Sequence, residues 1–129
     1  MRETLSIGDR VWFYGACYDE DTNAELIFNS DLCVVPGDVG LTAVHVMTFG
    51  TPCITHDDFR RQGPEFESII PGRTGLFFAF GNAAALADSI ATWLTDHPDR
   101  DAVRTACYRE IDERWTPEYE LAVLKEVVV

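Results

Sequence analysis

A glycine-containing turn follows a short apolar run in the first third of the chain. The apolar run covers residues 31–35, the turn covers residues 36–40, and a helical pattern begins directly after it. Glycine lets backbone amides approach a bound anion closely, and the first amides of a helix have no partner within the helix. The turn is therefore a candidate site for a phosphate or diphosphate. Such turns serve plain packing more often than binding, so the glycines alone leave both interpretations open.

Three polar side chains near this turn have helical spacing. Asp38, Thr42 and His45 are three and four residues apart, so we expect them on one side of the first helical turns. An imidazole can hydrogen-bond a ribose or sugar hydroxyl through one ring nitrogen while a neighbour fixes the other. His45 is thus a candidate contact for the sugar part of a nucleotide. The alternative is a partly buried histidine whose ring is satisfied by the backbone.

A second polar turn, after the next apolar run, contains residue types that bind divalent metals. Adjacent side chains on an extended loop point apart, so a solvated, hydrogen-bonded loop is the stronger interpretation, and no metal site is predicted. The neighbouring Arg60 and Arg61 could hold a phosphate by charge-assisted hydrogen bonds, although surface arginines more often pair with nearby carboxylates. The residues of this turn are Thr55, His56, Asp57 and Asp58.

Short strands and helices alternate along the chain and would position both turns. Apolar runs that end at Gly or Pro are typical of parallel strands covered by helices, and ligands bind beyond the carboxyl ends of such strands. The pattern predicts a doubly wound α/β fold. We expect strands at residues 11–14, 31–35, 52–55 and 76–78, helices at residues 19–28, 40–49 and 100–114 and from residues 82 and 117, and a loop at residues 56–74 with a short helix at residues 65–69.

Composition limits the classes of function. The 129 residues suit one domain, and the net charge of -12 argues against nucleic-acid binding, which depends on clustered basic residues. The four cysteines lack the close spacing of zinc or redox sites. The first residues are polar, and no window approaches the ~18 apolar residues of a membrane span. We therefore expect a reduced, cytoplasmic protein whose membrane contact, if any, comes through a partner.

One stretch carries a resemblance to a known family. PGDVGLTAVHVMTFGTPCIT, at residues 36–55, resembles the donor-site signature of GT-B glycosyltransferases, in the family-4-like group. The resemblance extends upstream to VWFYG at residues 11–15 and downstream to Glu67, to GRTGLF at residues 72–77 and to the helix from Asn82. GLTAVHVMTFGTP, followed by THDDF and PEFESI, is similar to bacterial surface-polysaccharide transferases.

The resemblance implies a Rossmann-like parallel sheet flanked by helices, forming an incomplete C-terminal domain of a GT-B enzyme over residues 1–129. In such enzymes this domain binds the nucleotide sugar, and the family needs neither a cofactor nor a bound metal. Two acidic positions of the family pattern differ: Gly37 stands where a Glu holds the transferred sugar, and His45 stands where a second Glu binds the ribose. The implied donor-binding residues are Gly37, Asp38, Val39, Gly40, Leu41, Thr42, His45 and Glu67.

Within this set, the amides of Gly40, Leu41 and Thr42 would hold the donor's diphosphate, and Asp38 would substitute for the missing first carboxylate. The resemblance implies a hexosyltransferase that moves a sugar from a UDP- or GDP-sugar to a glycan acceptor in polysaccharide biosynthesis. Its catalytic residues are unknown, because the acceptor-binding domain and the family's phosphate-binding Arg and Lys would lie outside this chain.

Two functions follow from these patterns. The first is the donor-binding portion of a glycosyltransferase, completed by a companion chain that supplies the N-terminal domain or by self-association, and peripheral at the inner membrane through such partners. The second is a non-catalytic Rossmann-like interaction module or an inactive fragment. Gly37 and His45, at positions where the family has Glu, favour the second.

Overall fold

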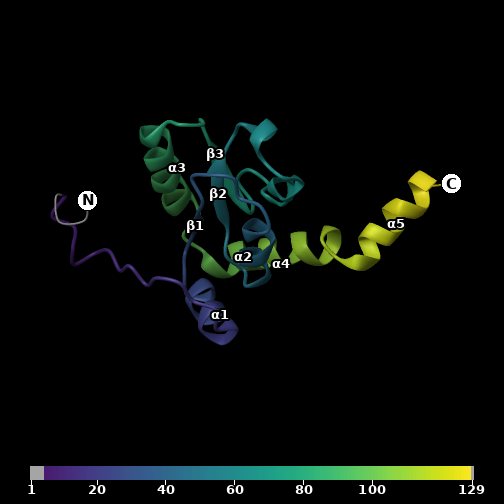
Figure 1. Cartoon of the computed structure of the whole chain (residues 1–129), viewed down its shortest axis with the longest axis horizontal. Coiled ribbons are helices and arrows are strands. Elements are labelled where there is room, and N and C mark those ends of the chain that lie inside the picture. The colour runs from purple at the N-terminus through teal and green to yellow at the C-terminus, as the bar shows by residue number, and fades with distance from the viewer. Residues whose placement is uncertain (1–4, 129) are drawn as a thin grey trace.

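A parallel sheet forms the centre of the molecule. The computed structural model describes residues 5–128. Its strands are β1 (Cys33–Val34), β2 (Cys53–His56) and β3 (Gly75–Phe78), in the order β1-β2-β3 (Figure 1). Cys53 of the central strand pairs with Cys33 on one side and Gly75 on the other. All four residues of β2 are buried, so its polar members must find hydrogen-bond partners inside the protein.

Helices alternate with the strands as expected for an α/β fold. Asp19, Asn82 and Asp99 each accept a hydrogen bond from a backbone amide of the first turn of the helix that follows. The Thr116 hydroxyl accepts one from Tyr119 in the same way. The α-helices are α1 (Glu20–Phe28), α2 (Thr42–Thr48), α3 (Ala83–Asp96), α4 (Arg100–Arg114) and α5 (Pro117–Val128), and the 3-10 helices are η1 (Phe59–Arg61) and η2 (Pro64–Ser68).

The hydrophobic core joins the sheet to three helices. Helix α2 packs on both β2 and α4, and α3 packs on β3. Val39 belongs to this core and is only 2% exposed, so the turn that precedes α2 is anchored by one of its own side chains. The core residues are Val39, Ala43, Val46, Met47, Cys53, Ile54, Ile69, Phe78, Trp93, Val103 and Cys107.

The prediction of a strand at residues 11–14 is wrong for this structure. The segment has no strand hydrogen bonds and extends away from the sheet (Figure 1). Trp12 and Phe13 are each 72% exposed, and Trp12 packs edge-on against Tyr14 at 4.9 Å between ring centroids. A β-branched and aromatic sequence favours a strand only where a neighbouring backbone offers hydrogen bonds. No described strand lies beside this segment to offer them.

Helix α5 also extends away from the sheet, on the side opposite the N-terminal segment (Figure 1). Leu121, Leu124, Val127 and Val128 are exposed along it. Among residues 5–128, no helix is both long and apolar enough to cross a membrane. The four apolar side chains named above are therefore exposed to solvent in the described part of the chain.

Cys53 and Cys107 behave as small core residues rather than as reactive groups. All four cysteines are free thiols, and Cys53 and Cys107 are fully buried. Burial raises the pKa of Cys107 to about 12, and the contact with the Cys33 thiol, together with burial, raises the pKa of Cys53. A thiol whose pKa is raised stays protonated at neutral pH and is a poor nucleophile.

Candidate functional site

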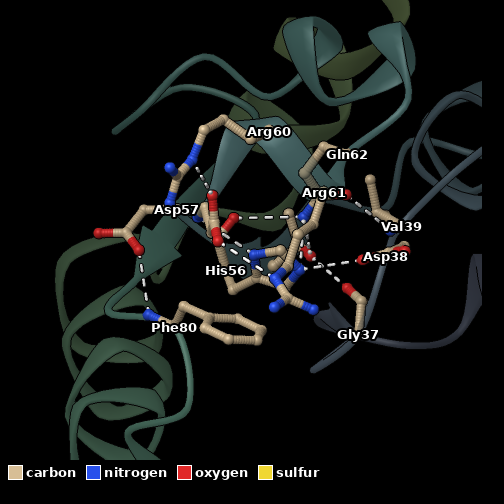
Figure 2. A network of polar contacts seen from close by, with 11 residues as sticks. Gly37, Asp38, Val39, His56, Asp57, Arg60, Arg61, Gln62 and Phe80 are labelled. Carbon is tan, nitrogen blue, oxygen red and sulfur yellow. Dashed lines mark hydrogen bonds and ion pairs between the residues drawn. The ribbon is translucent and has the colours of Figure 1, made fainter.

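The loops after the three strands meet at one edge of the sheet, because parallel strands share the edge at which they end. The Asp57 amide donates to the Phe78 carbonyl at 3.0 Å, and the Phe80 amide donates to Asp57 Oδ1 at 3.0 Å. The rings of His56 and Phe80 also touch, with centroids 4.8 Å apart. Figure 2 shows His56, Asp57 and Phe80 together with residues of the turn before α2.

The turn before α2 leaves two backbone amides unused. Gly40 has a φ of +50°, a conformation that favours glycine, and this reverses the chain after the buried Val39. The Thr42 amide closes the first turn on the Val39 carbonyl at 3.2 Å. Within residues 5–128, the amides of Gly40 and Leu41 donate to no protein acceptor. The Leu41 side chain is 73% exposed, so this corner of the molecule is open to solvent.

Two side chains support the turn from its inner side. Gln62 Oε1 accepts a hydrogen bond from the Val39 amide at 2.9 Å, and Gln62 Nε2 donates to Thr55 Oγ1 at 3.1 Å. The Thr55 hydroxyl in turn donates to the Gly37 carbonyl at 3.0 Å. A continuous chain of hydrogen bonds therefore links the Gly37 carbonyl to the Val39 amide through β2 and the loop after η1.

His56 holds the side chain of Asp38, the residue between Gly37 and Val39. The His56 side chain is fully buried, and its Nδ1 accepts a hydrogen bond from the Asp58 amide at 3.2 Å. A ring nitrogen that accepts carries no proton, so the neutral ring is protonated at Nε2. In this tautomer Nε2 donates to Asp38 Oδ1 at 3.3 Å, and the Gln62 amide nitrogen lies 3.2 Å from the same ring nitrogen (Figure 2). The Asp38 side chain is still 67% exposed, so one of its oxygens is fixed while the carboxylate faces solvent.

The other candidate residues lie on or beside α2. Thr42 and His45 are both exposed on this helix, and the His45 ring packs edge-on against Phe49 at 5.5 Å between centroids. Asp38 precedes the helix and bonds His56, so it is positioned by that contact rather than by helical spacing. Helix η2, which carries the exposed Glu67, packs against α2.

Arg60 and Arg61 pair with a neighbouring carboxylate. Their Nε atoms each lie 3.2 Å from an oxygen of Asp58, and the Arg61 guanidinium sits 4.9 Å above the Phe80 ring. Partial burial of Asp58 opposes its ionisation, but the hydrogen bond and charge of Arg60, together with the charge of Arg61, hold its pKa below the usual value. The two arginines therefore pair with a carboxylate of their own loop.

Sequence patterns missed the contribution of Gln62. It lies in a polar loop, and no spacing rule connects it with Val39, which is 23 positions earlier in the chain. Thr55 and His56 were expected in a solvated, hydrogen-bonded loop rather than in a metal site, whereas both are fully buried and hold the first turn. The available signal was the polar Thr-His pair at the end of an apolar strand, because polar residues at such a buried position need partners.

Comparisons with known proteins bear on the family and the fold. No curated protein sequence matches the chain. A structure of sucrose-phosphate synthase from Thermosynechococcus elongatus is similar over 98% of this chain, with 25% sequence identity and a TM-score of 0.76. The chain spans 31% of the length of that GT-B structure. The protein-family profile of glycosyl transferases group 1 matches residues 1–110. The chain therefore belongs to the group 1 glycosyl transferases and has the α/β architecture of part of a GT-B enzyme.

Proposed function

We propose that this chain is the donor-binding portion of a glycosyltransferase and that the turn at residues 37–42 binds the diphosphate of a UDP- or GDP-sugar. Membership of the group 1 family supports glycosyl transfer in general. The observation that carries the proposal is the pair of unused amides at Gly40 and Leu41, located beyond the carboxyl end of β1 in a turn whose Leu41 side chain is exposed. Backbone N–H groups can bind a diphosphate even in a protein of net charge -12, because the interaction is local.

The surrounding side chains have complementary roles in this proposal. The Asp38 carboxylate, held by His56, accepts a hydroxyl of the transferred sugar in place of the family's first Glu. The exposed imidazole of His45 contacts the ribose, and Glu67 lies near the donor on η2. Metal is not required, since backbone amides and α2 supply the stabilisation of the phosphate charge.

The rest of the reaction needs groups that this chain does not supply. The chain spans 31% of the related synthase, so the opposing domain and the glycan acceptor site belong to a part of the enzyme outside these residues, such as a companion chain or a second copy. Hexosyl transfer in polysaccharide biosynthesis, in the cytoplasm and peripheral to the inner membrane through partners, fits the similarity of residues 40–52 to surface-polysaccharide transferases.

Leu41→Pro provides the direct test of the diphosphate site. Leu41 has a φ of -60°, which matches the fixed φ of proline, so this change removes an amide N–H at a φ that the residue already has. Isothermal titration of the folded chain with UDP and GDP should show binding that weakens by roughly tenfold in Leu41→Pro. Leu41→Ala removes the exposed side chain but keeps the amide, so its affinity should match that of the original chain. Equal affinities for all three would contradict the proposed site.

His45→Ala should weaken nucleotide binding by about 1 kcal/mol, the amount typical of one lost hydrogen bond. His45→Gln keeps a side-chain donor and acceptor and should recover part of the loss. Separate titrations with UDP and with pyrophosphate locate the contact. If His45 contacts the ribose, His45→Ala weakens the binding of UDP but not that of pyrophosphate. An unchanged UDP affinity in His45→Ala would mean that His45 makes no contact with the nucleotide.

A non-catalytic interaction module is the second candidate function. Gly37 and His45 occupy positions where the family has Glu, and the apolar residues of α5 are uncovered. This candidate predicts a well-folded chain that binds neither UDP nor GDP. Calorimetry on the same samples, with thermal unfolding to confirm the fold, separates the two functions.

A further inference from the structure

We infer that Thr55 and Gln62 are positioning residues for nucleotide binding, and that they hold the turn at residues 37–39 so that the amides of Gly40 and Leu41 remain available to a diphosphate. The inference rests on the proposed function, because it assigns a task to residues that lie behind the proposed site. Neither residue has an exposed position from which to contact the donor directly: Thr55 is fully buried and Gln62 is half-buried.

The directions of the hydrogen bonds that link Gly37 and Val39 through Thr55 and Gln62 are determined by the two backbone ends. A carbonyl can only accept and an amide N–H can only donate, so the Gly37 carbonyl requires a donor and the Val39 amide requires an acceptor. The Thr55 hydroxyl donates to the former at 3.0 Å, and Gln62 Oε1 accepts from the latter at 2.9 Å. Gln62 Nε2 then donates to Thr55 Oγ1 at 3.1 Å and completes the link.

The direction of these hydrogen bonds explains why threonine is needed at position 55 and glutamine at position 62. A valine at position 55 has the shape of threonine but cannot donate, so the Gly37 carbonyl and Gln62 Nε2 would both lose a partner. A methionine at position 62 has a similar length but leaves the Val39 amide without an acceptor in a half-buried place. Leaving a buried polar group unpaired costs more than the bond itself is worth.

The cluster also couples the two turns of the site. Gln62 ends η1, and its amide donates to the Phe59 carbonyl at 3.3 Å, so the loop that carries Arg60 and Arg61 is fixed to the first turn through one side chain. His56 adds a parallel contact to Asp38 from the same strand (Figure 2). Three successive residues, Gly37, Asp38 and Val39, are therefore each held by a hydrogen bond from β2 or the loop after it.

A matched pair of threonines, Thr55 on the central strand and Thr51 two residues before it begins, tests the inference. Thr55 and Thr51 are both fully buried, at opposite ends of the segment that contains β2, and the Thr51 hydroxyl donates to the Ile27 carbonyl at 2.7 Å, away from the site. Thr55→Val should weaken UDP or GDP binding by roughly tenfold, whereas Thr51→Val should leave the affinity within about twofold. Thr55→Ser retains the hydroxyl and should restore nearly the original affinity. Calorimetry and thermal unfolding are measured on each full chain.

Amide hydrogen exchange gives a second measurement that does not depend on a ligand. In Gln62→Met the Val39 amide should exchange roughly tenfold faster, while core amides of β2 keep their protection. Unchanged exchange at Val39 would overturn the role of Gln62, and equal nucleotide affinities for Thr55→Val and the original chain would overturn that of Thr55. Equal losses in Thr55→Val and Thr51→Val would also overturn the inference, since they would reflect general destabilisation.

Failure of the proposed function has a different signature. In that case the original chain binds neither UDP nor GDP, and the assignment of Thr55 and Gln62 to nucleotide binding fails with it. Failure of the positioning inference alone leaves binding by the original chain intact and insensitive to Thr55→Val.

Discussion

Gly75→Ala is expected to destabilise this protein by more than about 3 kcal/mol, a large part of the roughly 5–15 kcal/mol that stabilises a typical domain. A Cβ at position 75 would lie 1.8 Å from the carbonyl oxygen of Cys53 and 2.8 Å from its carbon. These are backbone atoms of the central strand, and Cys53 is the register partner of Gly75. The clash can be relieved only by separating β3 from β2.

Gly37→Ala is the matched control for this effect. A Cβ at position 37 would meet no atom within 4 Å, and Gly37 lacks the positive φ found at Gly40. Its free energy of unfolding should therefore stay within about 0.5 kcal/mol of the original value in urea titrations. If Gly75→Ala unfolded at the same urea concentration as Gly37→Ala, the close approach of β2 and β3 would be wrong.

Trp93→Ala is expected to be the second large effect, with a loss of about 3–5 kcal/mol. Trp93 is only 1% exposed and is the largest fully buried side chain of the described structure. Its ring stacks on His97 with centroids 3.8 Å apart, and it belongs to the core cluster that joins α3 to the sheet and α4. Truncation would leave a cavity that the rigid sheet cannot fill by moving.

Leu94→Ala, at the next position of the same helix, separates burial from hydrophobicity. Leu94 is 49% exposed although it continues the apolar spacing of α3. Its truncation should cost less than about 1 kcal/mol, because little buried area is lost. Chemical denaturation of both variants gives the comparison. Equal losses would mean that α3 packs on the sheet through a different face.

The local rules of helices and strands were sufficient for most of the fold. Asn82 was expected to cap a helix and does so through the amide of Ala85. The apolar runs at residues 31–35, 52–55 and 76–78 contain the three strands, and their order predicts the parallel sheet that is observed. The helix cap and the apolar runs depend on residues close together in the chain, so the sequence carries their full signal, whereas the pairing of Cys53 with Cys33 and Gly75 joins distant residues.

Periodicity alone was less reliable about which side chains are buried. The apolar spacing of α3 predicted that Leu86, Ile90, Trp93 and Leu94 lie on one buried face. Leu86, Ile90 and Trp93 pack in the core, whereas Leu94 is exposed. The apolar segment at residues 11–14 has the composition of a strand and is extended without partners. Burial depends on a neighbouring element, which a local pattern does not contain.

By itself, the sequence determined the alternation of strands and helices, the two polar turns at the carboxyl edge of the sheet, and the resemblance to a glycosyltransferase donor site. Only the tertiary structure decided how those turns are held: Gln62 reaches the Val39 amide, Thr55 reaches the Gly37 carbonyl, and His56 reaches Asp38. These contacts join residues 18 to 23 positions apart. The physical reason is that a hydrogen bond is satisfied by proximity in space, which parallel strand pairing creates and sequence spacing does not encode.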